Sequence, residues 1–275
     1  MMNPEHKAQR EDAVRELGAE PAPTSVFVDS RWVGPAKKAA QWLMSTWAPV
    51  LPSGLGEERR ANLQRPMIDR IRDLVGWRQT QTLVGRRYGQ RGLRVAPAGS
   101  PEPGLATLQA RDGRRLVGTL SVRMDGPNGL AADYSFPDEL LRLRAKGRKL
   151  VEFSKLAVEG AGLSKPVLSG LFHMAYVYAD RILQADLVVM EVNPRHAPFY
   201  RRMLGAKRLE LGHNAAVDAP SVLLCLDLGH VRTQIDRFGG KPELADQVRC
   251  LYPYFYAPAE EAELLEQLRA DMAEA

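Results

Sequence analysis

VEFSKLAVEGAGLSKPV, residues 151–167, places a carboxylate inside an otherwise apolar strand pattern. The apolar residues around Glu152 predict a strand over 150–158, and the Ser-Lys-Pro at 164–166 is typical of a helix start. A glutamate is almost never buried without a partner. Glu152 is therefore either an outward-facing residue paired with an arginine or a carboxylate at a functional cleft, and the spacing alone favours neither.

The segments that follow predict a strand–helix–strand unit. A helix is expected over 165–183, because its apolar residues recur at helical spacing. Residues 185–192, ADLVVMEV, are apolar almost throughout, which is typical of a strand buried on both faces. Strand, helix and strand in immediate succession predict a βαβ unit with two parallel strands.

The rest of the chain predicts a mixed α/β domain with extensions, at 275 residues and a net charge of +5. Residues 78–93 predict a helix, and residues 105–126 predict a hairpin around the turn RDGR. We expect a partly helical N-terminal extension over 1–62, a main domain over 63–230 and a C-terminal helical extension over 231–275.

Cysteine content and terminal sequence favour a cytoplasmic protein. Cys225 and Cys250 are too few for a disulfide framework and lack metal-site spacing. The charged N-terminal sequence has no apolar segment typical of a signal peptide, and the longest apolar stretch is too short for a membrane span. Trp42 and Trp47 share one face of a predicted helix, so peripheral contact with a lipid or partner stays an alternative to packing.

The element order and one motif resemble the GCN5-related N-acetyltransferase (GNAT) superfamily. Its fourth motif has Asn, then Phe-Tyr, then Leu-Gly and an aromatic residue. NPRHAPFYRRMLGA, residues 193–206, matches it except that Ala206 replaces the aromatic. The resemblance implies the GNAT fold, which is a mixed α/β sheet of about six to seven strands with a βαβ core.

A narrower resemblance is to the long-chain N-acyl amino acid synthases, which are related to acyl-homoserine-lactone synthases. It rests on VEFSKLAV, on the NPRHxxFYRRxLG segment and on TLVGRRYGQRGL at 82–93, within residues 78–228. Lys155 replaces the commoner arginine. The resemblance implies an enzyme that transfers a long-chain fatty acyl group from the thioester of acyl carrier protein to the amino group of an amino acid.

The resemblance and the chemistry of acyl transfer together suggest the site residues. The enzyme must place an amine beside a thioester, remove a proton, bind the oxyanion and return a proton to the thiol. We expect Glu152 to position or deprotonate the amine and Tyr200 to reprotonate the sulfur. The expected acyl- and pantetheine-binding residues are Leu156, Ala157, Val158 and Lys165. The expected substrate-binding residues are Ser154, Lys155, Asn193, Arg195, His196 and Arg87.

Three of these residues also have other interpretations. Tyr200 is nearly as well explained as a core tyrosine with a bonded hydroxyl. Asn193 before Pro194 is typical of a cap and turn. His196 has an ordinary pKa suited to a base in its own right.

The turn after the first parallel strand favours a carrier protein as donor. Gly160 and Gly162 precede the helix, but Pro166 removes a backbone N–H donor from the first turn of the helix. Lys165 is the one lysine at this helix start. A helix N-terminus with one lysine is better suited to bind the single phosphate of phosphopantetheine than the diphosphate of coenzyme A. We therefore expect no bound cofactor, with the acyl-phosphopantetheine of acyl carrier protein as donor and acyl-coenzyme A as the alternative.

Basic clusters fit an acidic carrier protein as partner. A solvated helix face is the commoner explanation of such runs, and no nucleic-acid motif is present, so we expect no nucleic-acid partner. The bases are Arg142, Arg144, Lys146, Arg148, Lys149, Arg201, Arg202, Lys207 and Arg208.

Three other functions remain open at this point. The autoinducer synthases usually have tryptophan and acidic residues in an N-terminal region, and no equivalent of this pattern is found in the present sequence. A coenzyme A-dependent GNAT acyltransferase is disfavoured by the turn. A non-catalytic module that binds a carrier protein is disfavoured by the presence of Glu152 and Tyr200.

Overall fold

The computed structural model describes residues 66–93, 100–159 and 164–273. All these ranges belong to one compact unit. The expected N-terminal extension over 1–62, with its tryptophan helix, lies outside the described residues.

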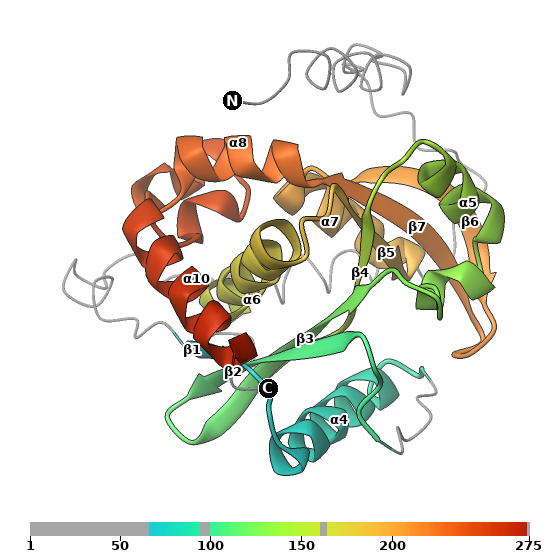
Figure 1. Cartoon of the computed structure of the whole chain (residues 1–275), viewed down its shortest axis with the longest axis horizontal. Coiled ribbons are helices and arrows are strands. Elements are labelled where there is room, and N and C mark those ends of the chain that lie inside the picture. Colours follow the sequence, from blue (N-terminus) through green and yellow to red (C-terminus); the bar gives the residue numbers. More distant parts are fainter. Residues whose placement is uncertain (1–65, 94–99, 160–163, 274–275) are drawn as a thin grey trace. The chain divides into compact units, whose positions relative to one another are not determined.

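A seven-stranded sheet with the order β1-β2-β3-β4-β5-β7-β6 forms the framework (Figure 1). Only the β4–β5 pair is parallel, and the other neighbours are antiparallel. This confirms the predicted mixed sheet of the GNAT fold and its βαβ core. The strands are β1 (Met67–Arg70), β2 (Leu105–Asp112), β3 (Arg115–Met124), β4 (Leu150–Val158), β5 (Leu187–Val192), β6 (Lys207–Asn214) and β7 (Ala219–Asp227).

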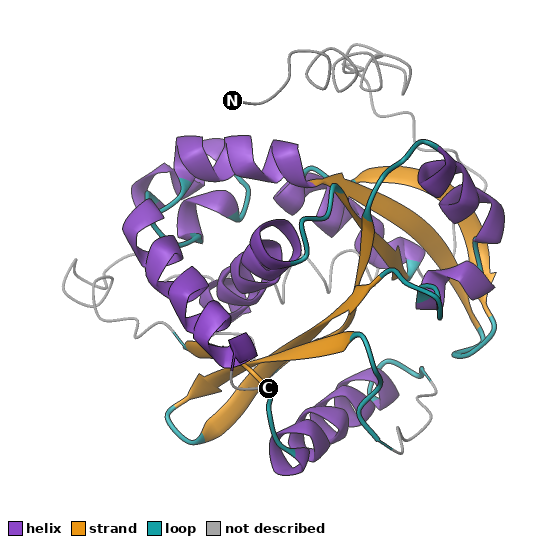
Figure 2. Cartoon of the chain, viewed as in Figure 1, coloured by secondary structure: helices purple, strands orange, loops and turns teal. Residues whose placement is uncertain are grey.

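Helices cover both faces of the sheet (Figure 2). The α-helices are α4 (Leu74–Gly89), α5 (Pro137–Ala145), α6 (Ser164–Val177), α7 (Ala197–Leu204), α8 (Leu228–Phe238), α9 (Ala245–Val248) and α10 (Pro258–Ala273). Shorter helical turns are η1 (Ala131–Tyr134), η2 (Tyr178–Ile182), η3 (Pro194–His196), η4 (Pro242–Leu244) and η5 (Tyr252–Tyr254). No described helix has the length and apolar character needed to cross a membrane.

The alternation of side chains along β4 separates two cores. Val151 and Phe153 pack with α6, α8, η5 and α10 in the larger core. Leu150 packs with η1 and α5 on the opposite face, in a smaller core. Glu152 belongs to this second face, because successive strand residues point to opposite sides. The predicted carboxylate is thus buried, with 2% of its surface exposed.

Two elements near the start of the described chain differ from the sequence prediction: strand β1 was not predicted, and helix α4 was predicted with a later start. Strand β1 has only four residues and buries Ile68 alone, which is too little for a periodic signal. Helix α4 begins at Leu74, ahead of the predicted start at 78, because Asp73 caps it by accepting a hydrogen bond from the Gly76 N–H at 2.7 Å. Leu74 and Val75 are exposed, so no apolar stripe marks this first turn.

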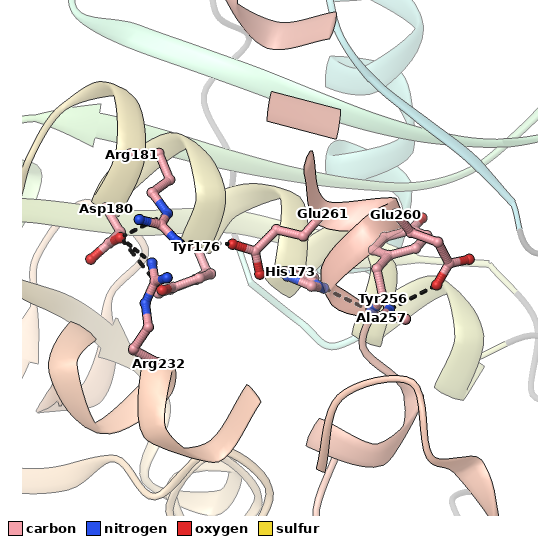
Figure 3. A network of polar contacts seen from close by, with 9 residues as sticks. All are labelled: His173, Tyr176, Asp180, Arg181, Arg232, Tyr256, Ala257, Glu260 and Glu261. Carbon is pink, nitrogen blue, oxygen red and sulfur yellow. Dashed lines mark hydrogen bonds and ion pairs between the residues drawn. The ribbon is translucent and has the colours of Figure 1, made fainter. Parts of the chain in front are cut away.

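A buried polar network holds α10 against α6 (Figure 3). His173, which is fully buried, accepts a hydrogen bond from the Tyr256 N–H at Nδ1 (2.8 Å). Its Nε2 therefore carries the proton and donates to Glu261 of α10 at 3.0 Å. Arg181 contacts the other oxygen of Glu261 at 3.4 Å. The network satisfies polar groups that would otherwise be costly to bury.

Candidate active site

The two parallel strands part halfway along their length. The β4–β5 ladder runs from Leu150 opposite Leu187 to Glu152 opposite Val189 and ends there. Both strands continue, β4 to Val158 and β5 to Val192. Within the described ranges, no strand pairs with the β5-facing edge of β4 beyond Glu152, which creates a place where an extended ligand can pair with the backbone.

A β-bulge accounts for the divergence. Ser154 pairs with Ser121 and Ala157 pairs with Thr119, so two residues of β4 face one of β3. Lys155 occupies the bulge with φ at 53°, a left-handed conformation that costs energy for a residue with a side chain. Such a bulge bends and twists its strand, here at the point where β4 leaves β5.

Glu152 lies at the end of the ladder in a nearly dry environment. Its Oε2 accepts a hydrogen bond from the Ala131 N–H of η1 at 2.6 Å. Burial raises the pKa of Glu152 to about 7, although the N–H groups of Ala131 and Ala132 and the Arg123 guanidinium oppose the rise. A carboxyl group with this pKa is part ionised at neutral pH and can accept a proton from a substrate.

Glu191 is the second carboxylate at this place. It lies on β5 on the same face as Glu152, and its charge contributes to the raised pKa of Glu152. Its Oε1 is buried and has no hydrogen-bond partner among the described residues. Arg123 lies opposite Glu152 on β3 and forms an ion pair with Glu102. Arg123 therefore opposes the raised pKa of Glu152 while it pairs with Glu102.

Two tyrosines belong to the end of α4 and to α7. Tyr88 of α4 packs beside Ala157 on one face, and Tyr200 of α7 packs on Phe172 of α6 on the other face, with ring centroids 6.2 Å apart. Burial raises the pKa of Tyr200, and Tyr88 adds to the effect while Arg91 opposes it. Both phenols are thus protonated at neutral pH and can donate hydrogen bonds.

This geometry has a counterpart among known proteins. A family model described as N-acyl amino acid synthase FeeM matches residues 79–227, which is just over half of the 275-residue chain. The chain belongs to this family. Membership in the FeeM family makes the protein an N-acyltransferase and confirms the predicted resemblance.

Solved structures agree with the family assignment. The structure of FeeM, an N-acyl amino acid synthase from uncultured soil microbes, is 26% identical with a TM-score of 0.56, over 62% of this chain and 94% of that chain. Spermidine N-acetyltransferase from Vibrio cholerae is 10% identical with a TM-score of 0.43, over 61% and 98%. An acyl-CoA N-acyltransferase from Pseudomonas aeruginosa is 15% identical with a TM-score of 0.42, over 58% and 97%. No curated protein matches this chain.

The FeeM-family motif after β5 places three of the predicted substrate-binding residues. The Asn193 side chain accepts a hydrogen bond from the Arg195 N–H at 3.2 Å and so caps η3. His196 is half-buried, and burial together with Arg91 and Arg195 lowers its pKa to about 4. His196 is therefore neutral at pH 7 and, in this free state, unsuited to hold a positive charge.

The residues expected to bind pantetheine line the diverging part of β4. Leu156 and Val158 pack towards the α6 face and Ala157 towards α4. Lys165, in the first turn of α6, lies with its ammonium 5.7 Å from the ring centroid of Tyr254. The turn with Gly160 and Gly162 lies outside the described residues.

Lys155 and Ser154 have partners inside the protein. The Lys155 ammonium donates to Glu102 at 3.0 Å, which ties the bulge to the loop before β2. Ser154 lies opposite Ser121. Arg87 uses one guanidinium nitrogen on Gln90 at 2.9 Å. Lys155 thus has a structural role that its sequence position alone did not reveal.

The predicted residues fall into two groups, and each group contains residues that the sequence did not single out. Glu191 joins Glu152, while Tyr88 and Arg91 join Tyr200 and His196. For Glu191, the available signal was a charge inside an apolar strand, the same signal that drew attention to Glu152. For Tyr88 and Arg91, the helix pattern carried no comparable signal, because their significance depends on α7. Among the described residues, no group of His, Cys, Asp and Glu could hold a metal ion.

Proposed function

We propose that this N-acyltransferase transfers a long-chain fatty acyl group from the thioester of acyl carrier protein to the amino group of an amino acid. One observation carries the proposal. A buried carboxyl group with a pKa near 7, that of Glu152, lies where β4 leaves β5 and where an extended thioester arm could pair with the strand. The family's name supports the amino acid as acceptor.

The expected reaction is direct attack by the amine. Glu152 takes one proton from the ammonium group, and the amine nitrogen attacks the thioester carbonyl carbon. A C–N bond forms, the C–S bond breaks and the thiolate leaves. The thiolate then takes up the proton held by Glu152, whose pKa of about 7 lies below the value of about 8.5 of a thiol. The nitrogen still carries one proton more than the amide, and this proton passes to the regenerated Glu152 carboxylate and then to solvent. No covalent enzyme intermediate is required.

Tyr200 acts in this scheme as a hydrogen-bond donor to the leaving sulfur. Its raised pKa makes complete proton transfer to a thiolate unfavourable, but it keeps the hydroxyl protonated. A donor placed at developing negative charge lowers the barrier without giving up its proton. This modifies the expectation that the Tyr200 phenol itself returns the proton.

The carrier protein would dock on the cations of α7 and β6 rather than on α5. Arg144 is engaged by Asp125 at 2.7 Å and Asp133 at 2.6 Å, and Arg148 by Asp227 at 2.9 Å. By contrast, Arg201, Arg202, Lys207 and Arg208 are exposed, and no ion pair is formed by them in the described part of the chain. Free surface cations steer an acidic partner more strongly than neutralised ones.

The acyl chain would enter the apolar core beneath the diverging strands. A cavity of about 10 Å³ lies there, lined by Phe153, Phe172, Tyr176, Leu204, Leu226, Leu228, Val231, Tyr252 and Phe255. This space holds about one water molecule, so a long chain requires these side chains to move apart. The apolar lining fits a fatty acyl group as the transferred moiety.

A product screen by mass spectrometry tests the proposal. The purified protein is mixed with palmitoyl-acyl carrier protein, palmitoyl-coenzyme A, all twenty amino acids and S-adenosylmethionine, and each donor is omitted in turn. We expect an N-palmitoyl amino acid that depends on the carrier protein. A product that forms equally from coenzyme A would overturn the carrier-protein assignment, and a lactone would identify an autoinducer synthase. Binding of the carrier protein without any product would indicate a non-catalytic module.

A further inference from the structure

The C-terminal segment from α8 to α10, residues 228–273, begins directly after the last residue that the family model matches. Its buried side chains line part of the apolar cavity on the α6 face of the sheet. We propose that Phe255, supported by Tyr252, forms the end wall of the acyl-chain site and so sets the longest fatty acyl chain that the enzyme accepts. The inference rests on the proposed transfer of a fatty acyl group and assigns the residues that select its length.

The cavity reaches from strand β4 to this C-terminal segment. Phe153 of β4 lines it and directly follows Glu152, so the two side chains point to opposite faces of the sheet. The cavity therefore lies behind the point where β4 leaves β5. An acyl chain that starts at this point and passes Phe153 ends at the segment. The residues of the segment that line the cavity are Leu228, Val231, Tyr252 and Phe255.

The lining of the cavity suits a hydrocarbon chain. Two of the lining residues carry hydroxyl groups, and both hydroxyls are engaged within the protein. Tyr252 donates to the Leu204 carbonyl at 2.6 Å, and Tyr176 donates to Asp180 at 3.4 Å. The surface that is left for a ligand consists of aromatic rings and aliphatic side chains, on which a saturated acyl chain packs favourably.

The end wall is anchored by hydrogen bonds and by ring contacts. The hydroxyl of Tyr252 is bonded to the end of α7, and beside it the Leu251 N–H donates to the Met203 carbonyl at 3.1 Å. The Phe255 ring centroid lies 5.0 Å from that of Tyr252 and 4.9 Å from that of His173, on which Phe255 stacks. Phe255 is therefore braced by side chains of two other elements, η5 and α6.

His173 is itself fixed by the polar network at the start of α10 (Figure 3). Its two ring nitrogens bond to the Tyr256 N–H at 2.8 Å and to Glu261 at 3.0 Å, which also fixes the backbone next to Phe255. Phe153 lies in the apolar core, where aromatic rings can change rotamer. We expect the rings near β4 to move aside for the chain and the anchored Phe255 to stop it.

A ladder of saturated acyl-acyl carrier proteins, from octanoyl to stearoyl, tests the inference on the full chain. For the wild type, kcat/KM should rise by up to about fourfold with each methylene that the site buries, and then fall sharply where the chain meets the wall. Phe255→Ala removes the ring and should move this limit to longer chains by roughly two to four carbon atoms. The first chain beyond the wild-type limit should gain at least about tenfold in kcat/KM.

A second variant should act in the opposite direction. Val231→Ile adds a methylene group to the lining from α8, so it should lower kcat/KM severalfold for the longest accepted chain and spare the shorter ones. Phe255→Leu is a milder change that carries the test if Phe255→Ala does not fold. An unchanged limit in a folded Phe255 variant would overturn the inference.

Leu268→Ala is the matched control. Leu268 of α10 is buried in the same core but is not among the residues that line the cavity. The variant should lose stability as Phe255→Ala does and keep the wild-type limit. A shift in Leu268→Ala as large as that in Phe255→Ala would show that a loosened segment, and not the ring, changes the limit, and would also overturn the inference.

A binding measurement separates the inference from the proposed function. Thermal stabilisation by the corresponding free fatty acids, kept below micelle-forming concentrations, reports on the site without turnover. A length limit in binding that depends on Phe255, without any acylated amino acid, would end the proposed function and keep the site. Turnover with the same length profile in the wild type and Phe255→Ala would end the inference and keep the acyltransferase. Neither turnover nor stabilisation would overturn both.

Discussion

Glu152 and Val189 form the last register pair of the parallel ladder between β4 and β5. The carboxylate therefore lies at the point where the strands separate, and not somewhere along a continuous sheet. Residues before this pair have strand partners on both sides, whereas residues after it have a free edge. The catalytic proposal depends on this coincidence of a proton acceptor and an unpaired edge.

The first prediction concerns the pH dependence set by Glu152. As a base it must be ionised, so kcat/KM is expected to rise with pH through about 7 and to fall tenfold per unit below it. Glu152→Gln keeps the oxygen that accepts the Ala131 N–H but cannot take a proton. We expect it to fold normally, to lose roughly 10²- to 10⁴-fold in kcat, and to lose this acidic limb. An unchanged turnover would remove the catalytic assignment.

Glu191→Gln tests the same assignment through a shift in the pKa of Glu152. Its charge helps to raise the pKa of Glu152, so Glu191→Gln should lower that pKa and move the acidic limb to lower pH. Activity at pH 8 is expected to persist, because the base remains. A pH–rate profile of kcat/KM measures both variants. A Glu191→Gln limb at the wild-type position would show that the two carboxyl groups do not interact.

Tyr200→Phe tests the hydrogen bond to the leaving sulfur. We expect kcat to fall about 10- to 100-fold with KM little changed, since the interaction strengthens only as negative charge develops. Tyr134→Phe is the control, because the Tyr134 side chain is 96% exposed. That variant should keep both its stability and its kcat. Equal effects of the two variants on kcat would argue that Tyr200 is a core residue.

The bulge at Lys155 can be examined through stability. Lys155→Gly keeps the left-handed conformation and loses only a partly exposed ion pair with Glu102, so its free energy of unfolding should change by less than about 1 kcal/mol. Lys155→Val places a β-branched residue at positive φ and should cost about 1–3 kcal/mol, together with activity. Urea denaturation and a standard assay measure both. Similar stabilities would mean that the backbone at this position is not left-handed in solution.

Glu261 offers a prediction about the C-terminal helix. Glu261→Ala removes the acceptor of the His173 Nε2–H and the contact with Arg181, and leaves a buried donor unpaired. We expect a loss of about 1–3 kcal/mol in the free energy of unfolding. Glu263→Ala, an exposed change on the same helix, should be nearly neutral. Chemical denaturation followed by circular dichroism compares them, and equal stabilities would show that α10 is held by its apolar contacts alone.

Charge reversal at the exposed arginines of α7 tests the proposed docking surface for the carrier protein. Arg201→Glu combined with Arg202→Glu should raise KM for acyl-acyl carrier protein about tenfold and weaken its salt dependence, with little effect on palmitoyl-pantetheine. Arg142 of α5 serves as the control. It already forms an ion pair with Glu139, so Arg142→Glu changes a surface that is partly neutralised. A larger increase in KM for the Arg142 variant would instead place the docking surface on α5.

Local patterns in the sequence determined the βαβ unit, the hairpin and the motif after β5. These features depend on neighbours in the chain: alternation along 150–158, an apolar face at helical spacing, and turn residues such as Gly113. Family membership followed from the same local motifs. Such signals are readable because the periods of strand and helix are properties of a few consecutive residues.

Only the tertiary structure decided what surrounds the site. The N–H groups of η1 and the charge of Glu191 reach Glu152 from other parts of the chain, and together with burial they determine its pKa. Likewise Arg144 loses its availability because Asp125 and Asp133 fold onto it. Burial, charge pairing and the parting of β4 from β5 are consequences of crossovers and register between distant segments, which no local pattern encodes.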